Sequence, residues 1–71
     1  MKKIKIRLDE VLKEKGYTQA QLADAIGVRR ATIHDLYHNK SKQIPIEVLT
    51  KIVNELNLKS VDEILVLVDE E

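Results

Sequence analysis

Cysteine is absent from the 71 residues of this sequence. Neither a disulfide framework nor a thiolate metal site can therefore hold the fold, and aliphatic packing must suffice. No apolar run approaches the roughly 20 residues that a membrane span requires, and the charged start, MKKIKIRLDE, does not lead into the apolar stretch of a signal peptide. We therefore expect a cytoplasmic protein that makes no membrane contact.

The usual signatures of catalysis are missing as well. The sequence has no cysteine nucleophile, no glycine-rich phosphate loop, and no Ser, His and acid at a recognisable spacing. A chain of this length forms one domain, residues 1–71, which is small for a large enzyme cleft. We expect neither an enzyme nor a bound cofactor.

An excess of one charge is also lacking, because the formal net charge is zero. The charges are nevertheless divided: residues 1–42 contain ten Lys or Arg and five acids, whereas residues 43–71 contain two and seven. This division predicts a molecule with a basic front half and an acidic back half. A basic patch is typical of nucleic-acid binding, and a solvated surface with clustered charges explains the pattern equally well.

Both ends of the chain have the pattern of a strand. In residues 3–8, aliphatic Ile4, Ile6 and Leu8 alternate with basic residues, which is a period of two. The run ILVLV, residues 64–68, is rich in β-branched side chains and fits a strand buried on both faces. A lone strand is unstable, so we expect these two strands to pair.

Helical patterns fill the sequence between the two strands. The first helix spans residues 9–15 and ends at Gly16; a capping box of Thr18 and Gln21 starts the second helix, which Gly27 ends. A third helix follows, then a polar loop over residues 38–43, and a fourth helix begins near Pro45. A second capping box, Ser60 with Glu63, predicts a short fifth helix or turn. The fold class is therefore mostly α.

The segment TQAQLADAIGVRRATI resembles the Cro/CI-type (XRE-type) helix-turn-helix family of bacterial and phage DNA-binding regulators. The resemblance implies a compact five-helix lambda-repressor-like domain over about residues 8–64, with the helix-turn-helix motif at 18–38. It also assigns the scaffold helix and the anchors of the recognition helix: Gln19, Leu22, Ala23, Gly27, Val28, Ile33 and Leu36. Helix geometry supports this, because two steeply crossing helices need a small contact residue, Ala23, and a turn residue of free φ, Gly27.

The resemblance further implies base-reading side chains at the start and middle of the recognition helix, namely Arg30, Ala31 and Asp35, flanked by Arg29 and Thr32. Arg30 could donate to guanine O6 and N7, Ala31 could touch a thymine methyl, and Asp35 could accept from cytosine N4. The alternatives are a phosphate contact for Arg30, a filler role for Ala31, and a salt bridge from Asp35 that orients Arg30 or His34.

Contacts to the DNA backbone are expected from the polar residues around this helix. Gln19, at a helix N-terminus, is the family's phosphate-binding position, and Lys40 and Lys42 would extend the contact, although simple solvation also explains both lysines. Thr18, His34 and His38 complete the predicted set. The two histidines have a metal-binding spacing, but no third ligand stands near them, so a DNA-facing or solvated pair is favoured.

We therefore predict a sequence-specific transcriptional regulator, a repressor that binds a pseudo-palindromic operator in double-stranded DNA as a homodimer and so associates with the nucleoid. The apolar strand 64–68 would be covered by the second protomer. The alternative is an antitoxin or adaptor-type module that uses the C-terminal strand to bind a protein partner.

Overall fold

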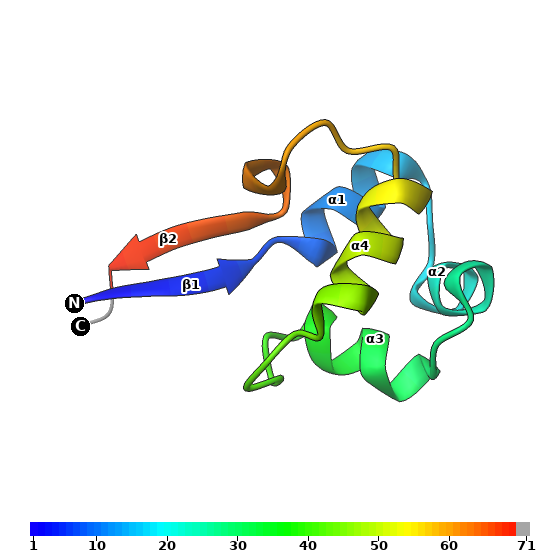
Figure 1. The fold of residues 1–71 in the computed structure, drawn as a ribbon, viewed down its shortest axis with the longest axis horizontal. Coiled ribbons are helices and arrows are strands. Elements are labelled where there is room, and N and C mark those ends of the chain that lie inside the picture. The colour runs from blue at the N-terminus through cyan, green and yellow to red at the C-terminus, as the bar shows by residue number, and fades with distance from the viewer. Residues whose placement is uncertain (70–71) are drawn as a thin grey trace.

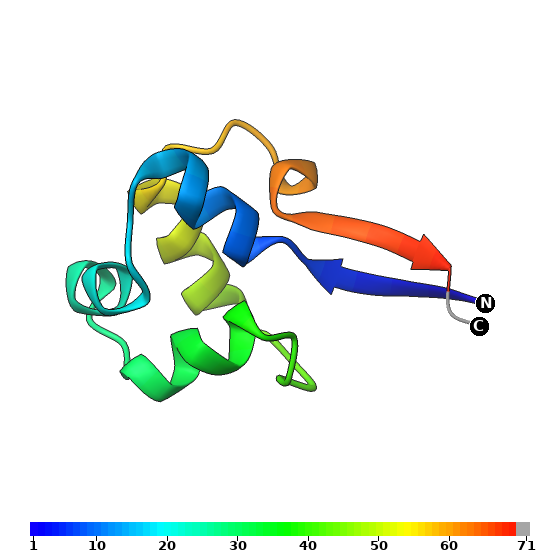
Figure 2. The same ribbon diagram turned by 180° about the vertical axis from the view of Figure 1, so that it is seen from behind.

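The computed structural model describes residues 1–69 and shows a helical body with a two-stranded arm (Figure 1). Along the chain the elements are β1 (Lys2–Ile6), α1 (Leu8–Lys15), α2 (Gln19–Ile26), α3 (Arg30–Tyr37), α4 (Ile46–Glu55), the 3-10 turn η1 (Val61–Glu63) and β2 (Leu65–Asp69). The arm extends from one side of the helices, and the N-terminus lies at its far end; the reverse view shows the same separation (Figure 2). None of the described helices has the length and hydropathy needed to span a bilayer.

The predicted ends of α1 and α2 are confirmed. Gly16 and Gly27 both adopt left-handed backbone conformations, with φ of 74° and 70°, which an L side chain rarely adopts. The capping box is also present: Thr18 Oγ1 accepts from the N–H of Gln21 at 3.1 Å, and Gln21 Oε1 accepts from the N–H of Thr18 at 2.9 Å. The start of α2 and the stops of both helices are therefore set by local sequence.

The predicted count of five helices is wrong. Residues 1–69 contain four α-helices, and the fifth is a single 3-10 turn, η1. Glu63 Oε2 accepts from the N–H of Lys59 at 2.5 Å and of Ser60 at 3.1 Å, and these donors hold the pKa of Glu63 below its ordinary value. The chain cannot continue as a helix because its next apolar residues pair with β1.

The predicted pairing of the two strands is confirmed, with different bounds. β1 and β2 are antiparallel, and Ile4 lies opposite Leu67. The strand expected over residues 3–8 ends at Ile6: the N–H of Arg7 donates to Ile64 O at 2.6 Å, and Arg7 O then accepts from Val11 N–H at 3.0 Å. Leu8 therefore begins α1, and β2 starts one residue later than expected.

The buried core lies between the four helices and the base of the arm. Its fully or nearly buried members are Ile6, Leu8, Val11, Leu12, Leu22, Ala23, Ile33, Leu36, Ile52, Leu56 and Ile64. The expectation that residues 64–68 are buried on both faces is wrong for the single chain, because Leu67 is 67% exposed and Ile4 opposite it is 66% exposed. The arm has too few neighbours to cover these two side chains.

The expected division into a basic and an acidic half does not follow the sequence halves in space. Strand pairing brings the lysines of β1 into the same sheet as Asp69, and Lys2 Nζ lies 2.7 Å from Asp69 Oδ1. The basic residues of the first half are divided among the arm, α1 with its N-cap Arg7, and α3 with the loop that follows it.

Candidate nucleic-acid interface

The packing of α2 against α3 determines which face of α3 reaches solvent. Leu22 and Ala23 of α2 and Ile33 of α3 are fully buried, and the N–H of Val28 donates to Ala23 O at 3.1 Å across the turn. Ala23 allows the close approach of the two helices because its side chain is small. Anchored in this way, α3 turns its polar side outward.

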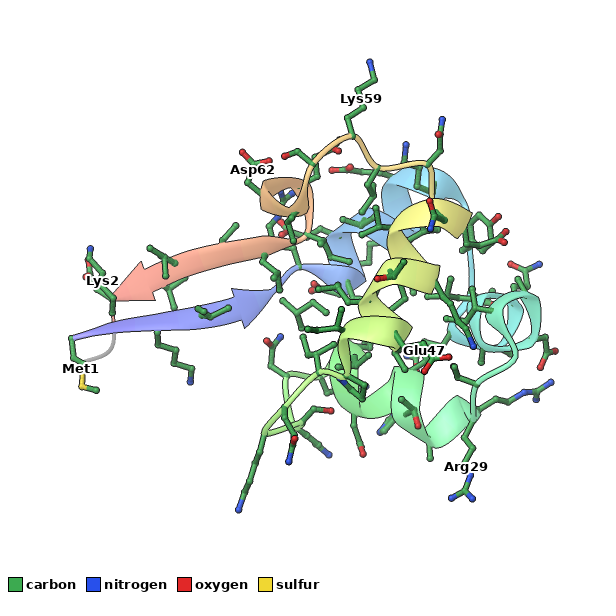
Figure 3. The ribbon with its side chains drawn as sticks, viewed as in Figure 1. Met1, Lys2, Arg29, Glu47, Lys59 and Asp62 are labelled. Carbon is green, nitrogen blue, oxygen red and sulfur yellow. The ribbon has the colours of Figure 1, made fainter. Side chains whose placement is uncertain are left out.

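The side chains predicted to read bases share this outer face. Arg29, Arg30, Ala31 and Asp35 are exposed, and Thr32 is half-buried. Arg29 occupies the N-cap of α3 without a side-chain capping bond, and its guanidinium extends away from the corner between α2 and α3 (Figure 3). The structure therefore brings the set together on one accessible surface, without showing what they bind.

The partner of Arg30 is a residue that the sequence reasoning missed. Arg30 Nη2 lies 3.1 Å from Asp24 Oδ2, at the end of α2, whereas Asp35 was the proposed orienting acid. Both side chains of the pair are about two-thirds exposed, so the pair contributes little to stability. The pair instead fixes a position, because Asp24 holds the Arg30 guanidinium beside the α2–α3 turn.

The residues predicted to contact phosphates are spread around the same surface. Gln19 is half-buried at the first turn of α2, and Lys40 and Lys42 are exposed in the loop after α3. The Thr18 hydroxyl already accepts the capping hydrogen bond. The set therefore lies at the first turn of α2 and in the loop that follows α3.

His34 of α3 and His38, the C-cap residue of that helix, are exposed neighbours with ring centroids 4.4 Å apart. Within residues 1–69, no group of three or more His, Cys or acidic side chains is arranged to hold a metal ion. The pair thus extends the polar outer face of α3 towards the loop that contains Lys40.

Two other polar groups stabilise the body rather than the outer face of α3. Arg7 Nε donates to Glu10 Oε2 at 2.7 Å, and this hydrogen bond raises the Arg7 pKa. The Tyr17 hydroxyl donates to Glu55 Oε2 at 2.6 Å, which raises the Tyr17 pKa and joins the α1–α2 turn to α4. Arg7 belongs to the basic front half of the sequence, yet its guanidinium forms ion pairs with Glu10 and Glu14.

Asn39 is a second residue to which the sequence pattern assigned no role. It follows α3 with a φ of 57°, and its side-chain amide makes two hydrogen bonds to the backbone of Ile6 in β1. Asn39 Oδ1 accepts from Ile6 N–H at 2.9 Å, and Asn39 Nδ2 donates to Ile6 O at 3.1 Å. No local signal indicates this contact, because the two residues are 33 positions apart.

Comparisons with known proteins bear on this arrangement. A family model described as the Cro/C1-type HTH DNA-binding domain matches residues 7–70. Among solved structures, the chain is similar to one titled SinR protein/SinI protein complex, with 29% sequence identity and a TM-score of 0.69. The match covers 73% of this chain and 50% of that chain, so it extends over half of the neighbour's length. A comparison with curated proteins gave no match.

Proposed function

The chain belongs to the family of Cro/C1-type helix-turn-helix DNA-binding domains, and we propose that it is a repressor that binds a pseudo-palindromic operator as a homodimer. The observation that supports this most is the outer face of α3, which is polar, exposed and free of large aliphatic side chains. Such a face on a firmly packed helix is suited to the major groove.

In this proposal Arg30 reads a guanine with two hydrogen bonds, and Asp35 accepts from a cytosine. Asp24 holds the Arg30 guanidinium at the α2–α3 turn before DNA arrives. Ala31 contacts a thymine methyl, and Arg29 and Thr32 flank these contacts.

The phosphate contacts lie beside the base contacts. Gln19 approaches one phosphate together with the free N–H groups at the start of α2. Lys40 and Lys42 bind the backbone beyond the other end of α3, and Thr18, His34 and His38 line the same path. These contacts position the protein on DNA without reading sequence.

The strand arm supports a dimer through β2. The edge of β1 contains three lysines and is occupied at Ile6 by Asn39, and lysines on edge strands discourage the addition of another strand. β2 presents Leu65, Val66, Leu67 and Val68 with no lysine. We therefore assign the edge of β2 to a second copy of the chain, which would cover part of the exposed apolar surface.

Arg30→Ala is the test of the base contact. A site is first selected from random duplexes with the wild-type protein, and affinities are then measured on that site and on single-base variants. We expect a loss of about 1–3 kcal/mol on the selected site and a relaxed preference at one base position. An equal loss on every sequence would instead make Arg30 a phosphate contact.

Asp24→Asn is the matched variant for this test. It removes the acid that holds Arg30 and keeps the side-chain shape, so we expect weaker discrimination with intact non-specific binding. Discrimination between base sequences equal to that of the wild type would show that Asp24 does not position Arg30 for DNA binding.

Gln19→Ala combined with Lys40→Ala tests the phosphate contacts. Specific and non-specific binding should weaken alike, and the loss of Lys40 should flatten the salt dependence by about one unit per protomer. An unchanged salt slope would take Lys40 out of the interface.

The second candidate function is a protein-interaction module of the antitoxin or adaptor type. The exposed pair Ile4 and Leu67 favours it, as does the similarity to a protein solved in a complex with another protein. Titration with random duplex DNA at two salt concentrations separates the candidates. A regulator binds weakly and with steep salt dependence, whereas a pure adaptor does not bind.

A further inference from the structure

The two ends of α3 are held in different ways. At its start, the short turn through Gly27 and Val28 joins α3 directly to α2. At its end, Asn39 N–H donates to Leu36 O at 3.2 Å and Lys40 N–H donates to Asp35 O at 2.8 Å, which closes the helix. The side chain of Asn39 then reaches Ile6 in β1. One residue thus ends the recognition helix and binds the strand arm.

The Asn39 amide takes the place of a neighbouring strand at Ile6. Along an antiparallel strand, successive residues direct their N–H and C=O groups to opposite edges. Arg7 N–H points to Ile64 at the base of β2, so the N–H and C=O of Ile6 point away from β2. A primary amide has one acceptor and two donors, and Asn39 uses both kinds to satisfy this edge.

This contact joins two parts of the molecule that have no other hydrogen bond between them within residues 1–69. The arm and its flanking residues, 1–7 and 64–69, connect to the predicted DNA-contacting segment, 18–42, through the two Asn39 bonds alone. Lys40 follows Asn39 directly, and Lys42 lies two residues further. A shift of Asn39 would therefore move both lysines relative to α3.

We propose that Asn39 is a positioning residue for DNA binding: its amide fixes the end of α3 and the Lys40–Lys42 loop against β1. This role rests on the proposed function, because it assumes that the loop contacts phosphates. Asn39 touches no DNA in this account and acts through the placement of Lys40 and Lys42.

The chain contains a matched control in Asn57. Asn57 follows α4 with a φ of 54°, its N–H donates to Asn54 O at 3.3 Å, and Leu58 N–H donates to Val53 O at 3.0 Å. The backbone thus closes α4 as it closes α3. In the described part of the chain, the Asn57 side chain makes no hydrogen bond to another residue. Asn57→Gly therefore removes a side-chain amide without removing a hydrogen bond between two elements.

The first experiment measures amide hydrogen exchange in Asn39→Gly and Asn57→Gly. Glycine keeps the left-handed backbone at either position, and helical circular dichroism verifies folding. In Asn39→Gly we expect exchange at the Ile6 amide to be roughly five- to tenfold faster, with the Leu22 amide unchanged. Asn57→Gly should leave Ile6 at the wild-type rate. Wild-type exchange at Ile6 in Asn39→Gly would show that the contact is absent in solution.

The second experiment measures the salt dependence of binding to a random duplex. In Asn39→Gly we expect weaker binding and a slope flattened towards that of Lys40→Ala, whereas Asn57→Gly keeps the wild-type slope. A merely structural role would not move the slope of a folded variant. Lys40→Ala should also cost less affinity in the Asn39→Gly background than in the wild type, because the two residues act in series.

Asn39→Asp provides a second variant with a near-identical side-chain shape. It keeps the acceptor for Ile6 N–H and loses the donor to Ile6 O, so exchange at the Ile6 amide should be faster than in wild type and slower than in Asn39→Gly. Exchange as fast as in Asn39→Gly would show that Asn39 Oδ1 does not accept from this N–H. Wild-type affinity and slope in folded Asn39→Gly would overturn the proposal while leaving the proposed function intact. If the wild type itself fails to bind DNA, the proposed function is wrong and the positioning role falls with it.

Discussion

The helical body, residues 8–56, and the strand arm, β1 with β2, differ in how they treat apolar side chains. In the body, Leu22, Ile33 and Ile52 are completely buried. On the arm, Ile4 and Leu67 form a cross-strand pair in which each side chain is about two-thirds exposed. The body buries its central apolar side chains and exposes one large aliphatic, Ile46 at the start of α4, whereas the arm exposes a cross-strand pair of them.

This difference indicates what each region requires to be stable. Four helices around one core can fold by their own packing. An isolated two-stranded sheet is marginal in water, and this one is attached through buried Ile6 and Ile64 and through the Asn39 amide. The base of the arm therefore completes the core of the body through Ile6 and Ile64, and we propose that its outer part is the region where another chain adds stability.

The largest expected effect comes from truncating one leucine in each region. Leu22→Ala removes a fully buried side chain and should cost about 2–5 kcal/mol of unfolding free energy, a large share of the stability of a small domain. Leu67→Ala should cost less than about 1 kcal/mol at low protein concentration, because its side chain is already in water. Urea unfolding measures both costs, and equal costs would show that Leu67 is as buried in solution as Leu22.

A charge on the arm tests whether the arm assembles. Val66→Lys should sediment as a monomer with its helical signal retained and should bind a selected operator much more weakly, because a lysine blocks strand addition at β2. Lys5→Gln is the control, since Lys5 lies opposite Val66 on β1 and leaves the β2 edge unchanged. A monomeric wild type at tens of micromolar, or a Val66→Lys variant that stays dimeric, would exclude β2 as the dimer interface.

The smallest effect concerns the junction of the two regions at Glu63. Its carboxylate accepts two backbone hydrogen bonds, so its folded pKa is lowered from an ordinary value of 4.5. A lowered folded pKa stabilises the protein above the ordinary value, and this contribution is lost as the pH falls through the folded pKa. Between neutral pH and pH values below 4.5, wild type should therefore lose more stability than Glu63→Gln.

Glu47→Gln is the control for this acid effect, because the Glu47 carboxylate faces Lys51 Nζ at 3.9 Å rather than backbone N–H groups. Denaturant titrations at a series of pH values compare the three proteins. Parallel acid profiles for wild type and Glu63→Gln would show that the two backbone hydrogen bonds do not persist in solution.

The helix-turn-helix motif could be predicted because its signals are local. The capping box spans Thr18 to Gln21, and each stopping glycine lies directly after its helix. The burial of Leu22, Ile33 and Leu36 follows from helical periodicity. These features depend on residues only a few positions apart, so they can be predicted from the local sequence.

The features that could not be predicted depend on distant residues meeting in space. Asp24 pairs with Arg30 only because of the angle between α2 and α3, and Asn39 meets Ile6 only because β1 pairs with β2. The exposure of Leu67 has the same origin, since the pattern ILVLV indicates a buried strand without naming what covers it. The segment predicted as a short fifth helix or turn forms only the 3-10 turn η1, because β2 begins at Leu65, two residues after Glu63.

We propose that the outer face of α3, rather than the lysine-rich arm, contacts DNA. The isotope-labelled protein is titrated with a short random duplex, and its amide chemical shifts are recorded at low and at raised salt. We predict that the shifts gather at Gln19, in the first turn of α3 and over residues 38–42, and that they fade as salt increases. Shifts that gather instead on Lys2, Lys3 and Lys5 of β1 would place the DNA on the arm, and the absence of shifts would show that the protein does not bind DNA.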